Sequence, residues 1–272
     1  MNSTSGMETV VSADGTEIAS KRKGSGPPLV LVHGSGVSDH RRWEIAGVRP
    51  SLAEHTTVYA LDRRGRGESG DADDYSMDKE VQDVLAVVKA IDRPVTLLGH
   101  SFGANLALEA SLRTDSLNGL VLYEPGIPVG DHTMGEPAVI AQMNDLLAEG
   151  NNEEALVVFL REIGGLTPDE IDIFRDDPSW ADRVAGAHTL PREEEACSMH
   201  ALRPNRLKDL ITPTLLLSGE NSPQKFKDAT KTIHDVLPNS RMVTFEGEQH
   251  VAMNNKPDLF VDAVLSFVQE VN

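Results

Sequence analysis

The sequence predicts an α/β fold, in which a mostly parallel, eight-stranded sheet has helices on both faces and carries a helical cap. Two observations predict this class. Short runs rich in apolar and β-branched residues alternate with longer stretches of helical period along most of the chain. This alternation stops between Pro125 and about Thr212, where only helical patterns occur. A helical insertion between two strands of a parallel sheet is typical of a cap that closes over a site and shapes it.

The predicted strands begin with a hairpin and continue as buried runs. Residues 8–11 and 16–22, joined by the turn residues Asp14 and Gly15, indicate two antiparallel strands. The continuous apolar run at 29–34 suits a strand that is buried on both faces. Further buried strands are expected at 57–61, 94–98, 119–123, 214–217 and 241–245.

Helical patterns fill the intervals between these strands. In the insertion we expect helices at 138–149 and 153–163, and helix starts at Thr167 and Pro191. We therefore expect residues 1–125 and 210–272 to form the core, and residues 126–209 to form a cap that carries substrate selectivity. The expected core helices cover 39–53, 76–91, 102–113, 223–237 and 257–270.

The composition argues against several classes of function. The 272 residues include 43 acidic and 25 basic side chains, for a formal net charge of −18, which disfavours binding to nucleic acid or to anionic membranes. The lone Cys197 permits neither an intrachain disulfide nor a thiolate metal cluster. The first residues lack the apolar segment of a secretory signal, and no apolar run approaches the ~18 residues of a membrane span. We expect a cytoplasmic monomer or homodimer that acts on a small molecule.

A glycine-flanked serine stands at the junction of a predicted strand and a predicted helix. The segment 99–103, GHSFG, follows the buried run VTLL and precedes the helical pattern ANLALEASL. Glycines on both sides relieve crowding in a tight strand-to-helix turn. Such a turn places the Ser101 hydroxyl at the carboxyl edge of the sheet, above a helix N-terminus whose dipole stabilises developing negative charge. The context therefore predicts a nucleophilic serine.

Three further segments follow predicted strands in the same way. In chain order, the motifs LVHGSG, DRRGRGESG, GHSFGA and EGEQH resemble those of the α/β-hydrolase superfamily, and the resemblance covers about residues 8–270. It implies a nucleophilic serine, a histidine base after the last strand, and an acid between them in sequence. An imidazole exchanges protons near neutral pH and can take the proton of Ser101 as it attacks, so His250 is the predicted base.

The position of the acid departs from the commonest pattern of the superfamily. Most members place an aspartate shortly after the strand that here ends in LLLSG, and the corresponding residue of this chain is Ser222. Some members carry the acid after the preceding strand, where this chain has Glu124. We predict that Glu124 is the acid, with Glu220 as the runner-up and Asp228 as a more distant alternative.

Two backbone N–H groups are expected to face the oxyanion. One is that of Phe102, the residue after the nucleophile. The other follows the first motif strand and belongs to Ser35, with Gly36 as the alternative. Asp62, Arg64 and Gly67 are expected to brace their turn rather than to take part in chemistry. The other histidines lack metal-ligand spacing, so we expect neither a metal nor another cofactor.

These residues predict hydrolysis of a small carboxylic ester, or a related acyl compound, through an acyl-enzyme. Dehalogenases and epoxide hydrolases of the superfamily use an aspartate nucleophile, so Ser101 argues against both activities. The alternatives are carbon–carbon bond hydrolysis, cofactor-free haloperoxidase or perhydrolase activity on the same three residues, and a non-catalytic ligand-binding protein. A dienoic diketone acid, as substrate of a carbon–carbon hydrolase, requires basic partners, for which Arg41 and Arg42 are candidates.

Overall fold

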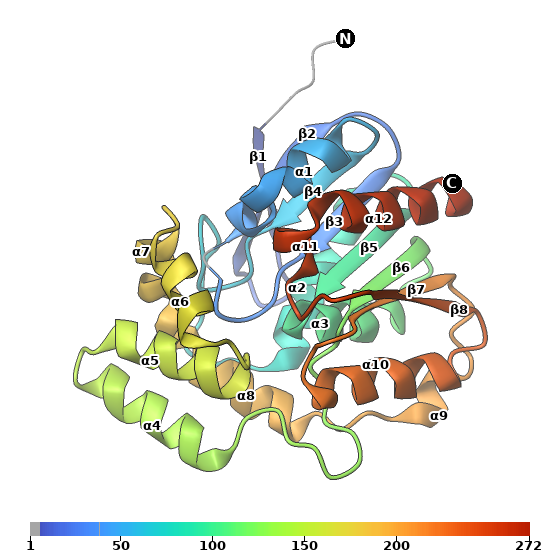
Figure 1. Cartoon of the computed structure of the whole chain (residues 1–272). Helices are drawn as coiled ribbons and strands as arrows, with labels where there is room; N and C mark the ends of the chain where they lie inside the picture. The colour runs from blue at the N-terminus through green and yellow to red at the C-terminus, as the bar shows by residue number, and fades with distance from the viewer. Residues whose placement is uncertain (1–5, 38) are drawn as a thin grey trace.

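A single sheet runs through the middle of the molecule (Figure 1). The structure, a computed structural model, describes residues 6–37 and 39–272, so the first five residues of the predicted core domain lie outside the described ranges. The eight strands follow the order β1-β2-β4-β3-β5-β6-β7-β8. Their bounds are β1 Gly6–Val11, β2 Glu17–Gly24, β3 Pro28–Val32, β4 Thr57–Leu61, β5 Val95–His100, β6 Leu117–Tyr123, β7 Thr214–Gly219 and β8 Ser240–Phe245.

The pairing of the strands confirms the predicted sheet. β1 and β2 form an antiparallel hairpin, β2 pairs antiparallel with β4, and the remaining pairs from β4 to β8 are parallel. In the register between β5 and β6, His100 lies opposite Tyr123. The residues that leave these two strands, Ser101 and Glu124, therefore emerge side by side at the carboxyl edge of the sheet, where ligands bind in folds of this kind.

Helices cover both faces of the sheet because successive strand residues point to opposite sides. In β3, Val30 and Val32 join the core under α2 (Met77–Ala90), α3 (Phe102–Ser111) and α10 (Gln224–Val236). Leu29 and Leu31 join the core on the other face, under α1 (Val48–Ala53), α11 (Ala252–Asn255) and α12 (Pro257–Val271). All four of these side chains are buried, as the continuous apolar run predicts.

The chain between β6 and β7 is fully described and contains helices but no strand. Several of these helices gather to one side of the sheet (Figure 1) and share an apolar cluster of their own, which includes Ile140, Leu156 and Leu190. α6 begins with a capping box in which the side chains of Thr167 and Glu170 bond each other's backbone N–H groups. The elements are α4 Pro137–Ala148, α5 Asn152–Val158, the π turn η3 Phe159–Ile163, α6 Pro168–Arg175, α7 Trp180–Ala185, the 3₁₀ turn η4 Gly186–Thr189, α8 Leu190–Met199 and α9 Pro204–Leu207.

The expected helix at 39–53 is the main error of the secondary-structure prediction. The segment forms two 3₁₀ turns, η1 (His40–Trp43) and η2 (Ile45–Gly47), before α1 begins at Val48. Ala46 and Gly47 have φ values of 54° and 75°, and a left-handed backbone cannot continue a right-handed helix. The apolar spacing of the segment therefore indicates burial correctly, but it does not reveal the break.

Among the described residues, no helix combines the length and the apolar character that crossing a bilayer requires.

Candidate active site

A pocket opens at the carboxyl ends of β3, β5 and β6. Its lining includes residues that follow these three strands, among them Ser35, Ser101 and Gly126, together with His250. The empty space of the pocket, together with the open solvent at its mouth, amounts to about 690 Å³. Much of the remaining lining is apolar and includes Val37, Met134, Phe159, Leu160, Leu166 and Phe226.

Ser101 occupies a strained turn between β5 and α3. Its φ and ψ angles are 56° and −122°, outside the regions that a residue with a side chain normally adopts. The turn is so tight that its glycines lie directly against neighbouring backbone atoms. A Cβ at Gly99 would lie 2.2 Å from the Gly103 carbonyl oxygen, and one at Gly103 would lie 2.3 Å from that of Val32. Only glycine fits these positions, as the GHSFG segment predicts.

His250 and Glu124 form a buried hydrogen-bonded pair. His250 Nδ1 donates to Glu124 Oε2 over 2.6 Å, although the two residues lie far apart in the chain. The other carboxylate oxygen, Oε1, accepts from the Gly219 N–H over 2.7 Å and from the Ser218 hydroxyl over 3.0 Å. Burial by itself raises the pKa of Glu124, but the hydrogen bond and charge of His250, with the other donors, hold this pKa below its ordinary value. The carboxylate is thus kept ionised against the imidazole.

The other two candidate acids have different partners. Glu220 is exposed and accepts from the Gly247 N–H over 2.9 Å. Asp228 lies 2.9 Å from His132 Nε2 and also accepts from a neighbouring glutamine on α10. Among the described contacts, neither carboxylate bonds His250.

Phe226 and His100 both contact His250. The Phe226 ring stacks on the imidazole with 4.0 Å between the ring centroids and 12° between the planes. His100 Nε2 donates to the backbone carbonyl of His250 over 2.8 Å. The stacked Phe226 ring and the bond to Glu124 orient the imidazole, and the bond from His100 holds the backbone that carries it.

The turn after β3 packs directly against the serine. A Cβ at Gly34 would lie 2.9 Å from Ser101 Cβ, and one at Gly36 would lie 2.5 Å from the Phe159 ring. Ser35 and Phe102, the two predicted oxyanion donors, both line the pocket with Ser101. The Ser35 hydroxyl donates to Glu193 Oε2 over 2.6 Å and so ties this turn to α8.

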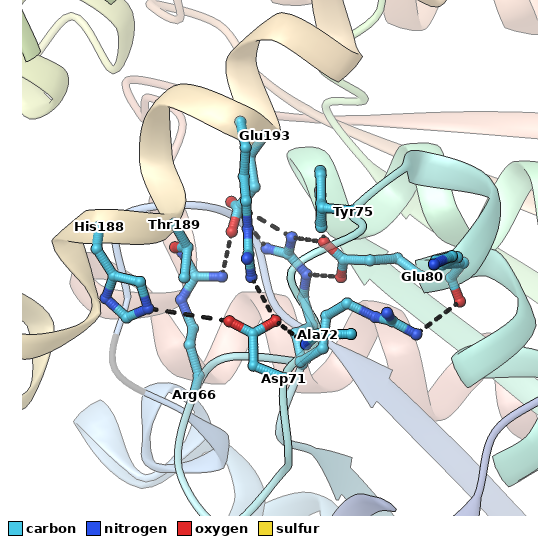
Figure 2. A network of polar contacts seen from close by, with 12 residues as sticks. Arg66, Asp71, Ala72, Tyr75, Glu80, His188, Thr189 and Glu193 are labelled. Atoms are coloured by element: carbon cyan, nitrogen blue, oxygen red, sulfur yellow. Dashed lines mark hydrogen bonds and ion pairs between the residues drawn. The ribbon is translucent and has the colours of Figure 1, made fainter. Parts of the chain in front are cut away.

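Glu193 belongs to a buried ionic network that joins α8 to the DRRGRGESG segment (Figure 2). The Arg66 guanidinium hydrogen-bonds Glu193 Oε1, and Arg63 Nη1 donates to Glu193 Oε2 over 3.3 Å. Arg63 also makes two bonds to Glu80, of 2.7 and 2.6 Å. Burial by itself raises the pKa of Glu193, but the charges of the two arginines lower it to about 2.

The turn residues Asp62, Arg64 and Gly67 lie in bracing positions. Asp62 accepts from the N–H groups of His40 and Glu68 over 2.7 and 3.0 Å. A Cβ at Gly67, where φ is 56°, would lie 2.4 Å from Asp62 Oδ2. Arg64 lies outside the pocket and pairs with Asp83 and Asp14.

One cluster has ligand atoms of the kind that hold a metal. Single atoms of Asp39, His40 and Asp62 all lie within 4.8 Å of one another, a grouping that the sequence does not predict. These atoms already have partners: Asp39 pairs with Arg41, and Asp62 accepts from His40 Nδ1 over 2.8 Å. The cluster is explained by these contacts, and we assign it no metal.

Two arginines line the pocket, Arg42 from η1 and Arg183 from α7. They differ from Arg41, which turns away from the pocket to pair with Asp39 and Asp182. Cys197 of α8 also lines the pocket, and its Sγ donates to the Gly126 carbonyl oxygen over 2.6 Å. Burial raises the pKa of this thiol well above its usual value.

A model of the alpha/beta hydrolase family matches residues 29–263. The chain belongs to this family.

Similar proteins include hydrolases of more than one kind. A solved alpha/beta hydrolase from Sphaerobacter thermophilus is 33% identical, with a TM-score of 0.81 over 94% of this chain and 100% of that one. An esterase from Rhodococcus is 26% identical, with a TM-score of 0.79 over 98% of this chain and 99% of that one. A 2-hydroxy-6-oxo-6-(2'-aminophenyl)hexa-2,4-dienoic acid hydrolase from Metapseudomonas resinovorans is 26% identical and covers 96% of this chain and 91% of its own.

The sequence of this alpha/beta hydrolase predicts the site residues that follow strands, but not those that helices bring to the pocket and its edge. Arg183 and Phe226 line the pocket from α7 and α10, and Glu193 of α8 bonds the pocket residue Ser35. Glu193 stands in the run Glu193-Glu194-Glu195, whose acidity is equally typical of any exposed helix start. The sequence carries no signal that distinguishes the two buried members, Glu193 and Glu194, from the exposed Glu195.

Proposed function

We propose that this alpha/beta hydrolase cleaves a small carboxylic ester through an acyl-enzyme, with Ser101 as nucleophile, His250 as base and Glu124 as acid. The observation that carries the proposal is the 2.6 Å bond between His250 Nδ1 and Glu124, at a pocket that both His250 and the strained Ser101 line. The bond leaves His250 Nε2 free to accept the proton of a hydroxyl.

The proposed reaction has two steps. Ser101 Oγ attacks the ester carbonyl while His250 Nε2 takes its proton, and the alcohol leaves with that proton. Water, activated by the same imidazole, then cleaves the acyl-enzyme and releases the acid. Glu124 stabilises the imidazolium in both steps. We assign the oxyanion to the backbone N–H groups of Phe102 and Ser35, with Gly36 as the alternative to Ser35.

We also propose that residues 126–209 act as a cap on a core formed by 1–125 and 210–272. In support, Phe159, Leu160 and Ile163 of η3 line the same pocket as Ser101. Because these side chains are apolar, the cap favours an apolar chain next to the ester. We place the enzyme in the cytoplasm because its single cysteine suits a reducing compartment. We expect a monomer or homodimer that needs no cofactor, since the three residues alone carry out the proposed reaction.

The proposal is tested with p-nitrophenyl esters of graded chain length. We expect Ser101→Ala to lower kcat by at least about 10⁴-fold, because no other nucleophile replaces the hydroxyl. Unchanged folding, checked by circular dichroism and melting temperature, is the required control. Appreciable turnover by this variant would refute the assignment of the nucleophile.

Glu124→Gln and Glu220→Gln form a matched pair for the acid. The first removes the charge opposite His250 and is expected to lower kcat by about 10²–10⁴-fold. The second changes an exposed side chain and is expected to alter kcat by less than about twofold. The reverse ranking would move the acid to Glu220.

Carbon–carbon bond hydrolysis is the second candidate, favoured by the dienoic acid hydrolase among the similar proteins. In this reaction the same three residues would cleave the carbon–carbon bond next to a ketone instead of an ester bond. A 6-aryl-2-hydroxy-6-oxohexa-2,4-dienoate, whose absorbance is lost on cleavage, separates the two functions. Turnover of this compound without turnover of the p-nitrophenyl esters would replace the esterase proposal.

A further inference from the structure

Six arginines are buried in the described part of the chain, and four of them have a carboxylate partner. Arg63, Arg64 and Arg66 pair with glutamates and aspartates inside the fold, and Arg49 pairs with Glu44. The other two, Arg42 and Arg183, make no ion pair with any described residue. They are also the only two of the six that line the pocket.

Arg42 is 2% exposed and only partly bonded. Its Nη1 donates to Asn254 Oδ1 over 2.7 Å, whereas its Nη2 has no hydrogen-bond partner among the described residues. Burial, followed by the neighbouring charge of Arg183, lowers the pKa of Arg42 to about 9. A buried guanidinium nitrogen without an acceptor is unfavourable unless something else supplies one.

Arg183 is 3% exposed and is held by neutral groups. Its Nη1 donates to the Gly36 carbonyl oxygen over 3.3 Å, and its Nε donates to the Ser179 hydroxyl over 3.2 Å. The guanidinium lies over the Phe174 ring, 4.7 Å from its centroid. Asp177 attracts both pocket arginines from a distance, but its Oδ1 accepts from the N–H and hydroxyl of Ser179.

We propose that Arg42 and Arg183 form a carboxylate-binding subsite, so that the substrate is an ester carrying a free carboxylate, such as a half-ester of a short dicarboxylic acid. This inference rests on the proposed esterase function and names its substrate class. Guanidinium groups match carboxylate oxygens in geometry as well as charge. A carboxylate supplies the acceptor that Arg42 Nη2 lacks and the ion-pair partner that neither arginine has among the described residues.

The rest of the pocket limits the other properties of the substrate. Its apolar lining, which includes Phe159, Leu160 and Leu166, suits methylene groups between the ester and the carboxylate. Arg42 Nη2 is a buried donor without a partner, and the two oxygens of a carboxylate need fewer such donors than the three terminal oxygens of a phosphate. No lysine and no third arginine lines the pocket among the described residues.

The kinetic test compares monomethyl adipate with dimethyl adipate, which differ by one negative charge. We expect the wild type to prefer the anionic half-ester in kcat/KM by about tenfold or more. Arg42→Gln and Arg183→Gln are each expected to reduce this preference by about 10–100-fold, the range for a hydrogen bond to a charged group. Arg49→Gln removes a buried arginine outside the pocket, and it should leave the preference unchanged.

Two results would overturn the subsite. One is a wild type that turns over dimethyl adipate as well as, or better than, the half-ester. The other is a preference that stays constant in both Arg42→Gln and Arg183→Gln. Arg42→Lys keeps the positive charge and loses the planar pair of guanidinium N–H donors. It should retain part of the preference, and it replaces Arg42→Gln if that variant does not fold.

A binding experiment separates failure of the subsite from failure of the esterase proposal. Titration calorimetry on Ser101→Ala measures the affinity for monomethyl adipate without turnover. Adding Arg42→Gln is expected to weaken the affinity at least tenfold, even if the wild type hydrolyses neither ester. Equal affinities in the two proteins would refute the subsite. Binding of n-butyl phosphate more than tenfold tighter than that of pentanoate would refute its assignment to carboxylates.

Discussion

Arg63 and Arg66 lie beneath α8, whereas Arg42 and Arg183 lie beside the pocket, and all four are at most 3% exposed. The first two share Glu193, and Arg63 also binds Glu80, so each charge is neutralised within the chain. The second two find only amide, hydroxyl and carbonyl partners. Carboxylates are plentiful in this acidic protein, so the difference indicates two uses of a buried cation. The paired arginines hold two segments of the chain together, and the unpaired arginines are available to bind an anion from solution.

Breaking the paired region should have the largest effect on stability. Glu193→Gln leaves Arg63 and Arg66 without their shared carboxylate, and we expect it to lower the free energy of unfolding by about 3–5 kcal/mol. Urea denaturation measures the change. Glu195→Gln, which alters an exposed side chain on the same helix, is the matched control and should fall within about 0.5 kcal/mol of the wild type. Equal stabilities of the two variants would mean that the network contributes nothing net.

The neighbouring Glu194 sharpens the comparison because it is buried beside the pocket without an ion pair among the described contacts. Burial, together with the charge of Glu193, raises the pKa of Glu194 to about 8. The folded state therefore binds a proton that the unfolded state releases near the ordinary glutamate pKa of 4.5. Stability from this proton is complete below pH 4.5 and is lost as the pH rises through about 8.

We expect the wild type to lose about 2–4 kcal/mol of unfolding free energy between pH 5 and pH 9 through Glu194, and Glu194→Gln to lose correspondingly less. Urea denaturation at both pH values measures the two slopes. Identical slopes in the two proteins would show that Glu194 is ionised throughout. The pH dependence of stability that Glu193 contributes has the opposite sign, since its stabilisation is lost only as the pH falls from 4.5 towards about 2.

The unpaired region should give the smallest change in stability. Replacing Arg42 by methionine removes an uncompensated buried charge and keeps much of the side-chain volume. We expect Arg42→Met to leave the free energy of unfolding unchanged or to raise it by up to about 1 kcal/mol. Arg63→Met, in contrast, should destabilise the protein, because Glu80 and Glu193 then remain buried without the positive charge that both of them bind. A destabilisation by Arg42→Met as large as that by Arg63→Met would remove the distinction between the two regions.

Most of the fold follows from local patterns in the sequence. Each predicted strand is found, with boundaries shifted by at most two residues, because apolar runs of this length between helices specify buried parallel strands. The helix expected at 39–53 fails because its break depends on two left-handed residues, of which only Gly47 is a residue type that favours this conformation. The π turn η3 and the short α11 likewise depend on tertiary packing.

The part of the site that is predictable lies at strand ends. Ser101, Glu124 and His250 each follow a recognisable strand, and parallel strands bring such positions to one edge, so their proximity follows from chain order. The roles of Ser35 and Phe102 rest on the same reasoning. Arg183 and Phe226 reach the pocket from helices whose placement is decided by packing over long sequence distances. An arginine on a helix is usually exposed and a phenylalanine usually belongs to the core, so neither residue type by itself indicates a position in a pocket.

Cys197 makes this chain convenient for spectroscopy. It is the single cysteine of the sequence, it is 3% exposed, and its thiol is held protonated by burial and bonded to Gly126. A thiol in this state reacts slowly with maleimides at neutral pH. Cysteines introduced at exposed positions, for example one on α4 and one on α12, can therefore be labelled with a fluorophore pair without first removing the native residue. The distance between the helical segment and the sheet then becomes measurable in solution, with and without substrate.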